Sequence, residues 1–196
     1  MTGDPAEVAG VAGAPASVFH VVGEEEVWQG RRISMAVAEI EGPDGSRYSR
    51  DIVHHPGAVG VVPLHDDGTV TLVCQYRAAL DRMIWEVPAG LRDVIGEPTS
   101  LTAARELAEE AGLAATSYEH LLTFHNSPGF SDEALDVYLA TGLSEVADDR
   151  QGPEEEHMVV QRFALSEALA MVGDGRITDA KTVIGILATA RRVGPG

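Results

Sequence analysis

Apolar and polar residues alternate through much of the first half of the chain, which predicts a β-rich region. Two stretches between the alternating segments carry turn chemistry: Gly42-Pro43-Asp44-Gly45, and His65-Asp66-Asp67-Gly68, which indicates a hairpin. A third stretch, Gly23–Glu26, is expected to end the first strand. The strands expected from this pattern cover residues 17–22, 31–41, 47–54, 58–64, 69–76 and 84–87.

The pattern changes to a helical period at residues 99–111. The apolar stripe at this spacing consists of Leu101, Ala104, Leu107, Ala108 and Ala111. Gly112 follows where a helix C-terminal cap belongs. Further strands are expected near 118–124, 135–140 and 158–163, and further helices at 166–172 and 178–192. Strands before, between and after helices predict an α/β sandwich with a mixed sheet.

Composition divides the chain of 196 residues into three parts. Residues 1–16 are rich in Ala and Gly but lack the basic start and apolar stretch of a signal peptide, so we expect a mobile tail. Residues 17–55 are expected to form a β-rich N-terminal lobe, and residues 56–196 the main domain. Strand-like segments of the lobe carry apolar residues on both faces, which predicts a homodimer built through it.

Charge and cysteine content limit the kinds of partner and metal site that we expect for this chain. The formal net charge is −17, with 31 acidic residues and Lys181 as the lone lysine. Such a chain should repel nucleic-acid backbones and attract divalent cations. Cys74 is the one cysteine, which excludes an internal disulfide and a Cys-based zinc site. No apolar run reaches the length of a membrane span. From these features together we expect no nucleic-acid partner, no membrane partner and a cytoplasmic location.

The segment with the most chemical information runs from Gly90 to Leu113. On the predicted helix, Glu106 and Glu110 lie four residues apart on one face, as do Arg105 and Glu109. Paired carboxylates provide the oxygen ligands that Mg²⁺ or Mn²⁺ prefers. The Arg105–Glu109 pair can keep that face oriented. For a Glu-rich helix taken by itself, the alternative is an ordinary solvated face.

This segment resembles the Nudix box, G-x5-E-x7-R-E-U-x-E-E-x-G-U, in which U is a bulky apolar residue. Every fixed position from Glu97 to Leu113 matches. One residue is inserted between Gly90 and Glu97, so Gly96 takes the place of the usual glutamate and the role of Glu97 is left open. The resemblance implies a Nudix-type α/β/α sandwich with a mixed sheet, and a metal-dependent hydrolase.

The resemblance extends beyond the box to bacterial ADP-ribose pyrophosphatases. It rests on the segments 50–53, 75–77, 85–90, 127–133 and 154–158, and it covers the chain from about Trp28 to Ala190. In that family, metals are held by the backbone carbonyl before the box glycine and by the box glutamates. For this chain the resemblance implies metal binding by Ala89, Glu106 and Glu110, with Glu109 as a further candidate.

The same resemblance implies a set of substrate contacts. Arg77 would bind the substrate phosphates, with a surface salt bridge at a strand end as the alternative. Trp28, Arg50 and Asp51 would grip the adenosine half, partly across a dimer interface. Trp28 offers a stacking face, and the alternative for this residue is a place in the core.

Other expected contacts lie at the start of the box and in a turn-rich loop. Gly90 and Leu91 belong to the implied substrate site. Ser127 and Glu133 match the loop that holds the terminal ribose, although Ser-Pro-Gly also forms ordinary turns. The histidines without a family counterpart are predicted to be surface or structural residues: His54, His55 and His157.

The base that activates the attacking water is expected in an acidic loop, because carboxylates that bind metal have their lone pairs occupied. Asp132–Glu133 and Glu154–Glu155–Glu156 offer such groups. By charge pattern, the second loop is a solvated one, but the family places its catalytic glutamate in the matching loop. The resemblance therefore implies Glu155 as the base, with Glu154 and Glu156 as alternatives and Glu133 next.

The function expected on these grounds is Mg²⁺-dependent hydrolysis of ADP-ribose to AMP and ribose 5-phosphate, with Mn²⁺ as a substitute. A broader hydrolase of nucleoside diphosphate sugars or oxidised nucleotides is the alternative within this class, because pocket shape sets base selectivity. The alternative from a different class is a non-catalytic module that senses ADP-ribose. Such domains usually lack the box glutamates, whereas this chain keeps Glu106, Glu109 and Glu110.

Overall fold

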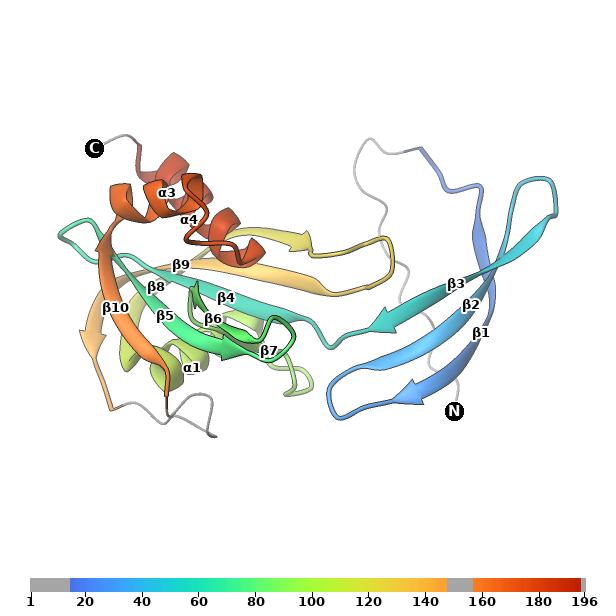
Figure 1. Cartoon of the computed structure of the whole chain (residues 1–196), viewed down its shortest axis with the longest axis horizontal. Coiled ribbons are helices and arrows are strands. Elements are labelled where there is room, and N and C mark those ends of the chain that lie inside the picture. The colour runs from blue at the N-terminus through green and yellow to red at the C-terminus, as the bar shows by residue number, and fades with distance from the viewer. Residues whose placement is uncertain (1–14, 148–156, 195–196) are drawn as a thin grey trace. The chain divides into compact units, whose positions relative to one another are not determined.

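The computed structural model describes residues 15–147 and 157–194. Most of the tail expected at 1–16, and the acidic loop with Glu154, Glu155 and Glu156, lie outside the described residues. The chain divides into two compact units, residues 1–53 and 54–196. The described part of the first unit contains strands, and the second contains both strands and helices (Figure 1).

The first unit is a three-stranded antiparallel sheet. Its strands are β1 (His20–Gln29), β2 (Ser34–Glu41) and β3 (Arg47–His54), paired in the order β1-β2-β3. The expected break at Gly23–Glu26 is wrong, because β1 continues through these residues and pairs with β2. Register shifts between Val21 and Gly23 and between Glu26 and Trp28 absorb the irregular sequence, as β-bulges do in edge strands.

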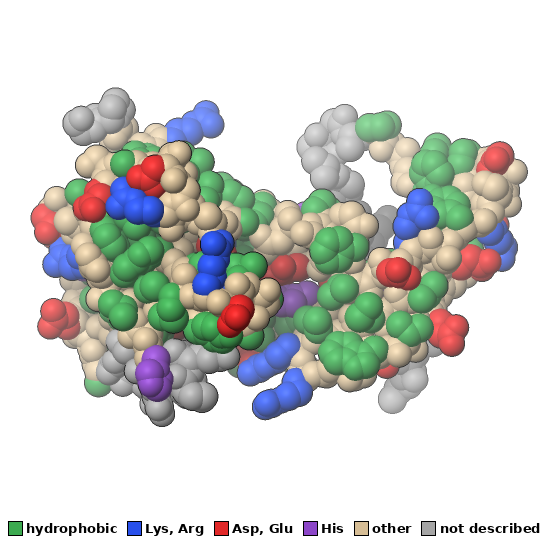
Figure 2. Space-filling model, viewed as in Figure 1, with side chains coloured by type: hydrophobic (Ala, Val, Ile, Leu, Met, Phe, Trp, Pro, Cys, Tyr) green, Lys and Arg blue, Asp and Glu red, His purple; other side chains and the backbone are tan. Residues whose placement is uncertain are grey.

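Strand β1 exposes apolar side chains to an unusual degree. All ten of its residues are exposed, and large apolar side chains lie on the visible surface of this unit (Figure 2). The exposed apolar residues of this unit include Val18, Phe19, Val21, Val22, Val27, Trp28 and Met35. A three-stranded sheet of this kind leaves much of its apolar surface without cover from the described residues of the same unit.

The second unit contains two sheets. One has the order β7-β4-β9-β8, and in it β4 and β9 are parallel while the other pairs are antiparallel. Its strands are β4 (Ala58–Pro63), β7 (Ala89–Leu91), β8 (Leu113–His125) and β9 (Ala134–Glu145). The other sheet has the order β10-β5-β6, formed by β5 (Thr69–Arg77), β6 (Arg82–Glu86) and β10 (Val159–Ala164).

Helices pack on both sides of these strands, so the predicted α/β/α sandwich with a mixed sheet is confirmed. α1 (Thr99–Ala111) contributes Ala103 and Leu107 to one apolar core, together with Val59 and Val61 of β4. A second core forms where α3 (Leu165–Gly173) and α4 (Ala180–Val193) cover the strands from the other side (Figure 1). Buried residues of that core include Val62, Leu72, Val137, Phe163, Met171 and Ile186.

The helix that carries Glu106, Glu109 and Glu110 begins and ends as the pattern predicts. Gly112 caps its C-terminus at φ 62°, where its N–H reaches the carbonyls of Ala108 and Leu107. The sequence pattern missed β7, because three residues after Pro88 are too few to show alternation. Among the described residues, no helix combines the length and the apolar character that crossing a membrane requires.

Candidate active site

The predicted i, i+4 pair of glutamates lies against β7. Glu106 and Glu110 are 8% and 5% exposed, so this face of α1 is buried rather than solvated. The backbone N–H of Ala89 donates a hydrogen bond to Glu110 Oε2 at 2.9 Å. A Cβ added to Gly90 would lie 2.0 Å from the carboxyl carbon of Glu106. The helix and the strand therefore meet so closely that any side chain at position 90 would displace the Glu106 carboxylate.

Arg105 lies at the centre of an acidic cluster. Its guanidinium donates to Glu106 Oε1 at 2.7 Å and to Glu109 Oε2 at 3.3 Å. Glu97 and Asp93 add carboxylate oxygens at 3.6 and 3.8 Å. The Arg105–Glu109 contact is the i, i+4 pair that the sequence predicts. One cation thus faces four carboxylates.

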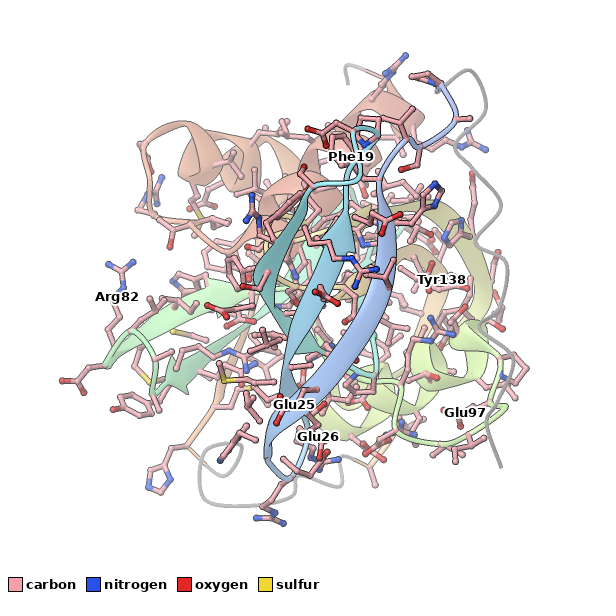
Figure 3. The ribbon with its side chains drawn as sticks, turned by 90° about the vertical axis from the view of Figure 1, so that its right-hand side faces the viewer. Phe19, Glu25, Glu26, Arg82, Glu97 and Tyr138 are labelled. Carbon is pink, nitrogen blue, oxygen red and sulfur yellow. The ribbon has the colours of Figure 1, made fainter. Side chains whose placement is uncertain are left out.

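Glu97 belongs to this cluster despite the inserted residue. It lies at the end of the loop that precedes α1 (Figure 3), where Gly96 adopts φ 79°. Thr102 Oγ1 donates to Glu97 Oε2 at 2.7 Å, which ties the loop to the first turns of the helix. A hydrogen bond of 2.5 Å between Thr99 and Tyr138 joins the start of α1 to β9.

The electrostatics of the cluster favour a bound cation. Burial is the main cause that raises the pKa of Glu106 to about 7. The charges of Glu109 and Asp93 raise it further, and Arg105 only partly opposes the shift. A carboxylate that is disfavoured in its charged form gains most from a positive ion nearby. The carboxylate oxygens of Glu106, Glu109 and Glu110 are donors of the kind that a hard divalent cation prefers.

The donor groups are not gathered into a ready coordination shell. In residues 15–147 and 157–194, no three His, Cys, Asp or Glu side chains are grouped so that they could hold a metal ion. All three expected ligand side chains already contact other groups: Glu106 and Glu109 accept from Arg105, and Glu110 accepts from the Ala89 backbone N–H. Metal binding would require these carboxylates to exchange such contacts for the ion.

Arg77, the expected phosphate contact, lies at the end of β5 and binds Glu86. Its Nε and Nη2 donate to the two carboxylate oxygens of Glu86 at 2.6 and 2.7 Å. Glu86 is fully buried, whereas the Arg77 side chain is 42% exposed. This contact differs from the surface salt bridge considered above, because one partner is in the interior. The guanidinium is held in a fixed plane with part of it open to solvent.

The loop with the expected ribose contacts is tied to the start of the second unit. Asp132 accepts hydrogen bonds from the backbone N–H of His55 at 2.9 Å, and its other oxygen lies 2.6 Å from His54 Nδ1. Glu133 Oε1 lies 3.9 Å from His55 Nδ1. The sequence contained no signal for these contacts, because the partners are 77 and 78 positions apart.

Ser127 performs a turn function in this structure. Its carbonyl accepts from the backbone N–H groups of Phe130 and Ser131 at 3.0 and 2.9 Å. These bonds are the turn chemistry that the Ser-Pro-Gly sequence predicts. Leu91 lies on β7 beside Gly90, and pairs with Ala58 of β4.

The residues expected to contact the adenosine half of the substrate all lie in the first unit. Trp28 is 51% exposed, so it is not a core residue of this chain. Its ring lies over Gly30, where an added Cβ would approach the ring within 2.3 Å. The Arg50 guanidinium lies 4.6 Å from the centre of the Tyr48 ring. Asp51, on β3, is exposed.

Comparison with known proteins identifies the class that this fold and this acidic helix define. The chain belongs to the NUDIX domain family, whose pattern matches residues 54–183. The chain is a Nudix hydrolase, and enzymes of this family generally use divalent metal ions. The sequence-based assignment to the family is confirmed.

Individual relatives cover most of the chain. It is 41% identical over 170 residues to an ADP-ribose pyrophosphatase of Mycobacterium tuberculosis, covering 87% of this chain and 82% of the relative. It is 39% identical over 165 residues to an ADP-ribose pyrophosphatase of Bacillus subtilis, covering 84% and 89%. The crystal structure of an ADP compounds hydrolase shares the fold with a TM-score of 0.79 at 20% identity, covering 92% of this chain and 96% of that one.

Proposed function

We propose that this enzyme hydrolyses the diphosphate of ADP-ribose, giving AMP and ribose 5-phosphate. The observation that carries the proposal is the buried pair of Glu106 and Glu110 against β7. Two relatives at about 40% identity, both called ADP-ribose pyrophosphatases, support ADP-ribose as the substrate. The chain keeps the box glutamates that a non-catalytic sensing domain would not need.

In the proposed reaction, water attacks one phosphorus atom of the diphosphate and the bond from that phosphorus to the bridging oxygen breaks. The carboxylates of Glu106, Glu109 and Glu110 and the Ala89 carbonyl would hold Mg²⁺, for which Mn²⁺ can substitute. The ion would offset negative charge on the phosphate oxygens. Arg77 would orient the diphosphate through the part of its guanidinium that faces solvent.

The proton of the attacking water has to be accepted by a separate carboxylate. We assign this role to Glu155, with Glu154 and Glu156 as alternatives, on the resemblance alone because these residues lie outside the described chain. Glu133 is the next candidate, with its side chain 23% exposed beside His55. A positioned general base contributes about 10²–10⁴ to the rate.

The remaining substrate contacts belong to the same proposal. Trp28 would stack on the adenine, and its exposed ring is available for this contact. Arg50 and Asp51 would bind the adenosine half, Ser127 and Glu133 the terminal ribose, and Gly90 and Leu91 the part of the substrate near the metal.

The test is a panel of nucleoside diphosphate sugars and oxidised nucleoside diphosphates, assayed with Mg²⁺, with Mn²⁺ and with excess chelator. We expect kcat/KM to be highest for ADP-ribose, with AMP and ribose 5-phosphate formed in equal amounts and no turnover in chelator. Comparable kcat/KM for several sugars would favour the broader hydrolase. Tight ADP-ribose binding without products would favour the sensing module.

We also propose a homodimer built through the N-terminal unit. The exposed apolar residues of β1 support it, because burying such a surface against a second copy is favourable by roughly 25 cal/mol for each square ångström covered. Light scattering should give twice the chain mass of 20.7 kDa. A monomer at micromolar concentration would contradict the proposal. The cytoplasmic location, and the lack of nucleic-acid and membrane partners, stay predictions.

A further inference from the structure

Lys181 is the one lysine of the chain, and it is buried. It lies in the first turn of α4 with its side chain 9% exposed. Its ammonium group contacts the carboxylate of Glu86 and lies 3.0 Å from Asp179 Oδ1. Lysine is almost never buried without such partners, because its charge loses solvation. The proposed reaction assigns no role to this ammonium group.

Glu86 connects Lys181 to the candidate active site. The carboxylate has no exposed surface, and its Oε2 accepts hydrogen bonds from both Arg77 Nη2 and Lys181 Nζ. Its Oε1 accepts from Arg77 Nε at 2.6 Å. With both oxygens engaged, the carboxylate cannot rotate without breaking a charged hydrogen bond. The plane of the Arg77 guanidinium is fixed by the same contacts.

The start of α4 is itself fastened to the strand segment that leads to β7. Asp179 caps the helix, accepting from the Thr182 backbone N–H at 3.0 Å and from Thr182 Oγ1 at 2.6 Å. The backbone N–H of Val87 donates to Thr182 Oγ1 at 2.8 Å in the interior. Lys181 therefore extends from a helix start that is held rigidly. Val87, which is bonded to that helix start, lies two residues before Ala89.

We propose that Lys181 is a positioning residue for diphosphate binding: through Glu86, it holds the Arg77 guanidinium in the orientation that receives the substrate phosphates. The inference rests on the proposed function, in which Arg77 binds the diphosphate. Arg77 and Lys181 together balance the charges of Glu86 and Asp179. Removing the Lys181 ammonium frees one oxygen of Glu86 to move and makes the surroundings of Arg77 more negative by one unit. Both effects weaken the attraction between Arg77 and a diphosphate.

The test compares KM and kcat for ADP-ribose hydrolysis in Lys181→Met and wild-type enzyme. Arg77 would bind the phosphates equally in the ground state and the transition state, so KM should rise about tenfold while kcat changes by less than about threefold. Lys181→Arg keeps the positive charge and should restore most of the affinity. Arg191→Met is the matched control, because it removes a cation from the last turn of the same helix, and its KM should equal that of the wild type.

A role in folding alone is distinguished by two further variants. If Lys181→Met does not fold because Glu86 is left with one cation, Glu86→Gln combined with Lys181→Met removes both buried charges and should fold. That double variant leaves Arg77 without its carboxylate, so its KM should also rise about tenfold. In an Arg77→Met background, Lys181→Met should produce no additional rise in KM, because Lys181 acts through Arg77.

The outcomes separate this inference from the proposed function. If wild-type enzyme is active and folded Lys181→Met has unchanged KM, the positioning role is overturned and the proposed function stands. An additive rise in KM when Lys181→Met joins Arg77→Met also overturns it, because the two residues would then act independently. If the wild type hydrolyses no compound of the substrate panel, the proposed function fails first, and the inference with it.

Discussion

Replacing Gly90 by alanine tests how closely the strand must approach the carboxylates of α1. The new Cβ would lie 2.0 Å from the carboxyl carbon of Glu106 and 2.2 Å from both of its oxygens, with ordinary contact beginning at 3.4 Å. The carboxyl group would have to move by more than an ångström. A misplacement of about 1 Å in a catalytic arrangement can lower the rate about 10²-fold. We therefore expect kcat/KM to fall by about two orders of magnitude.

Gly90→Ala should still fold, with a loss of stability at the lower end of what overpacking causes. The atoms that the new methyl group meets are the end of a flexible side chain, which can leave by rotating. Overpacking of this kind costs about 1–3 kcal/mol. Thermal unfolding and steady-state kinetics would be measured together, with Gly173→Ala as the control, because an added Cβ there meets no atom within 4 Å. Full activity of a folded Gly90→Ala enzyme would refute the close approach.

Three further results are expected. Glu106→Gln and Glu110→Gln should each abolish turnover while circular dichroism is unchanged, and full activity at saturating Mg²⁺ would contradict their role as ligands. Glu155→Gln should lower kcat by about 10²–10⁴ with ADP-ribose still bound; less than a threefold loss would redirect the search to Glu133. Burial opposes ionisation of Glu86, but Arg77 and Lys181 outweigh it and lower its pKa below the ordinary 4.5. The stability that Glu86 contributes is therefore complete above that value and is lost as pH falls through the lowered pKa, so Glu86→Gln should flatten the acid limb of unfolding curves.

The sequence predicts those parts of the fold that depend on neighbouring residues. The apolar period of α1 and the left-handed cap at Gly112 are local features, and both are present. β7 is not local, because its three residues form a strand by pairing with Ala58, Val59 and Gly60 of β4. The continuation of β1 through Gly23 likewise depends on β2, which pairs across the bulges. Pairing between distant segments cannot be inferred from one segment's pattern.

The candidate site likewise contains contacts that the local sequence predicts and contacts that it does not. The spacing of Glu106 and Glu110 predicts a shared helix face, because helix geometry converts spacing into direction. The contact of Lys181 with Glu86 joins residues 95 positions apart, so no local pattern could reveal it. The single lysine in an acidic chain was the one available signal. It indicates neither that the residue is buried nor which residue it contacts.

The surroundings of Arg105 favour one of the two interpretations of a Glu-rich helix. On a solvated face, water would screen each carboxylate, and the helix would need no further cation. Here Glu106 is buried against Gly90, and the single charge of Arg105 faces four carboxylates within 4 Å. This excess of negative charge supports the proposed divalent cation, which oxygen ligands bind. The net charge of −17 alone could not establish this, because it counts acids without placing them.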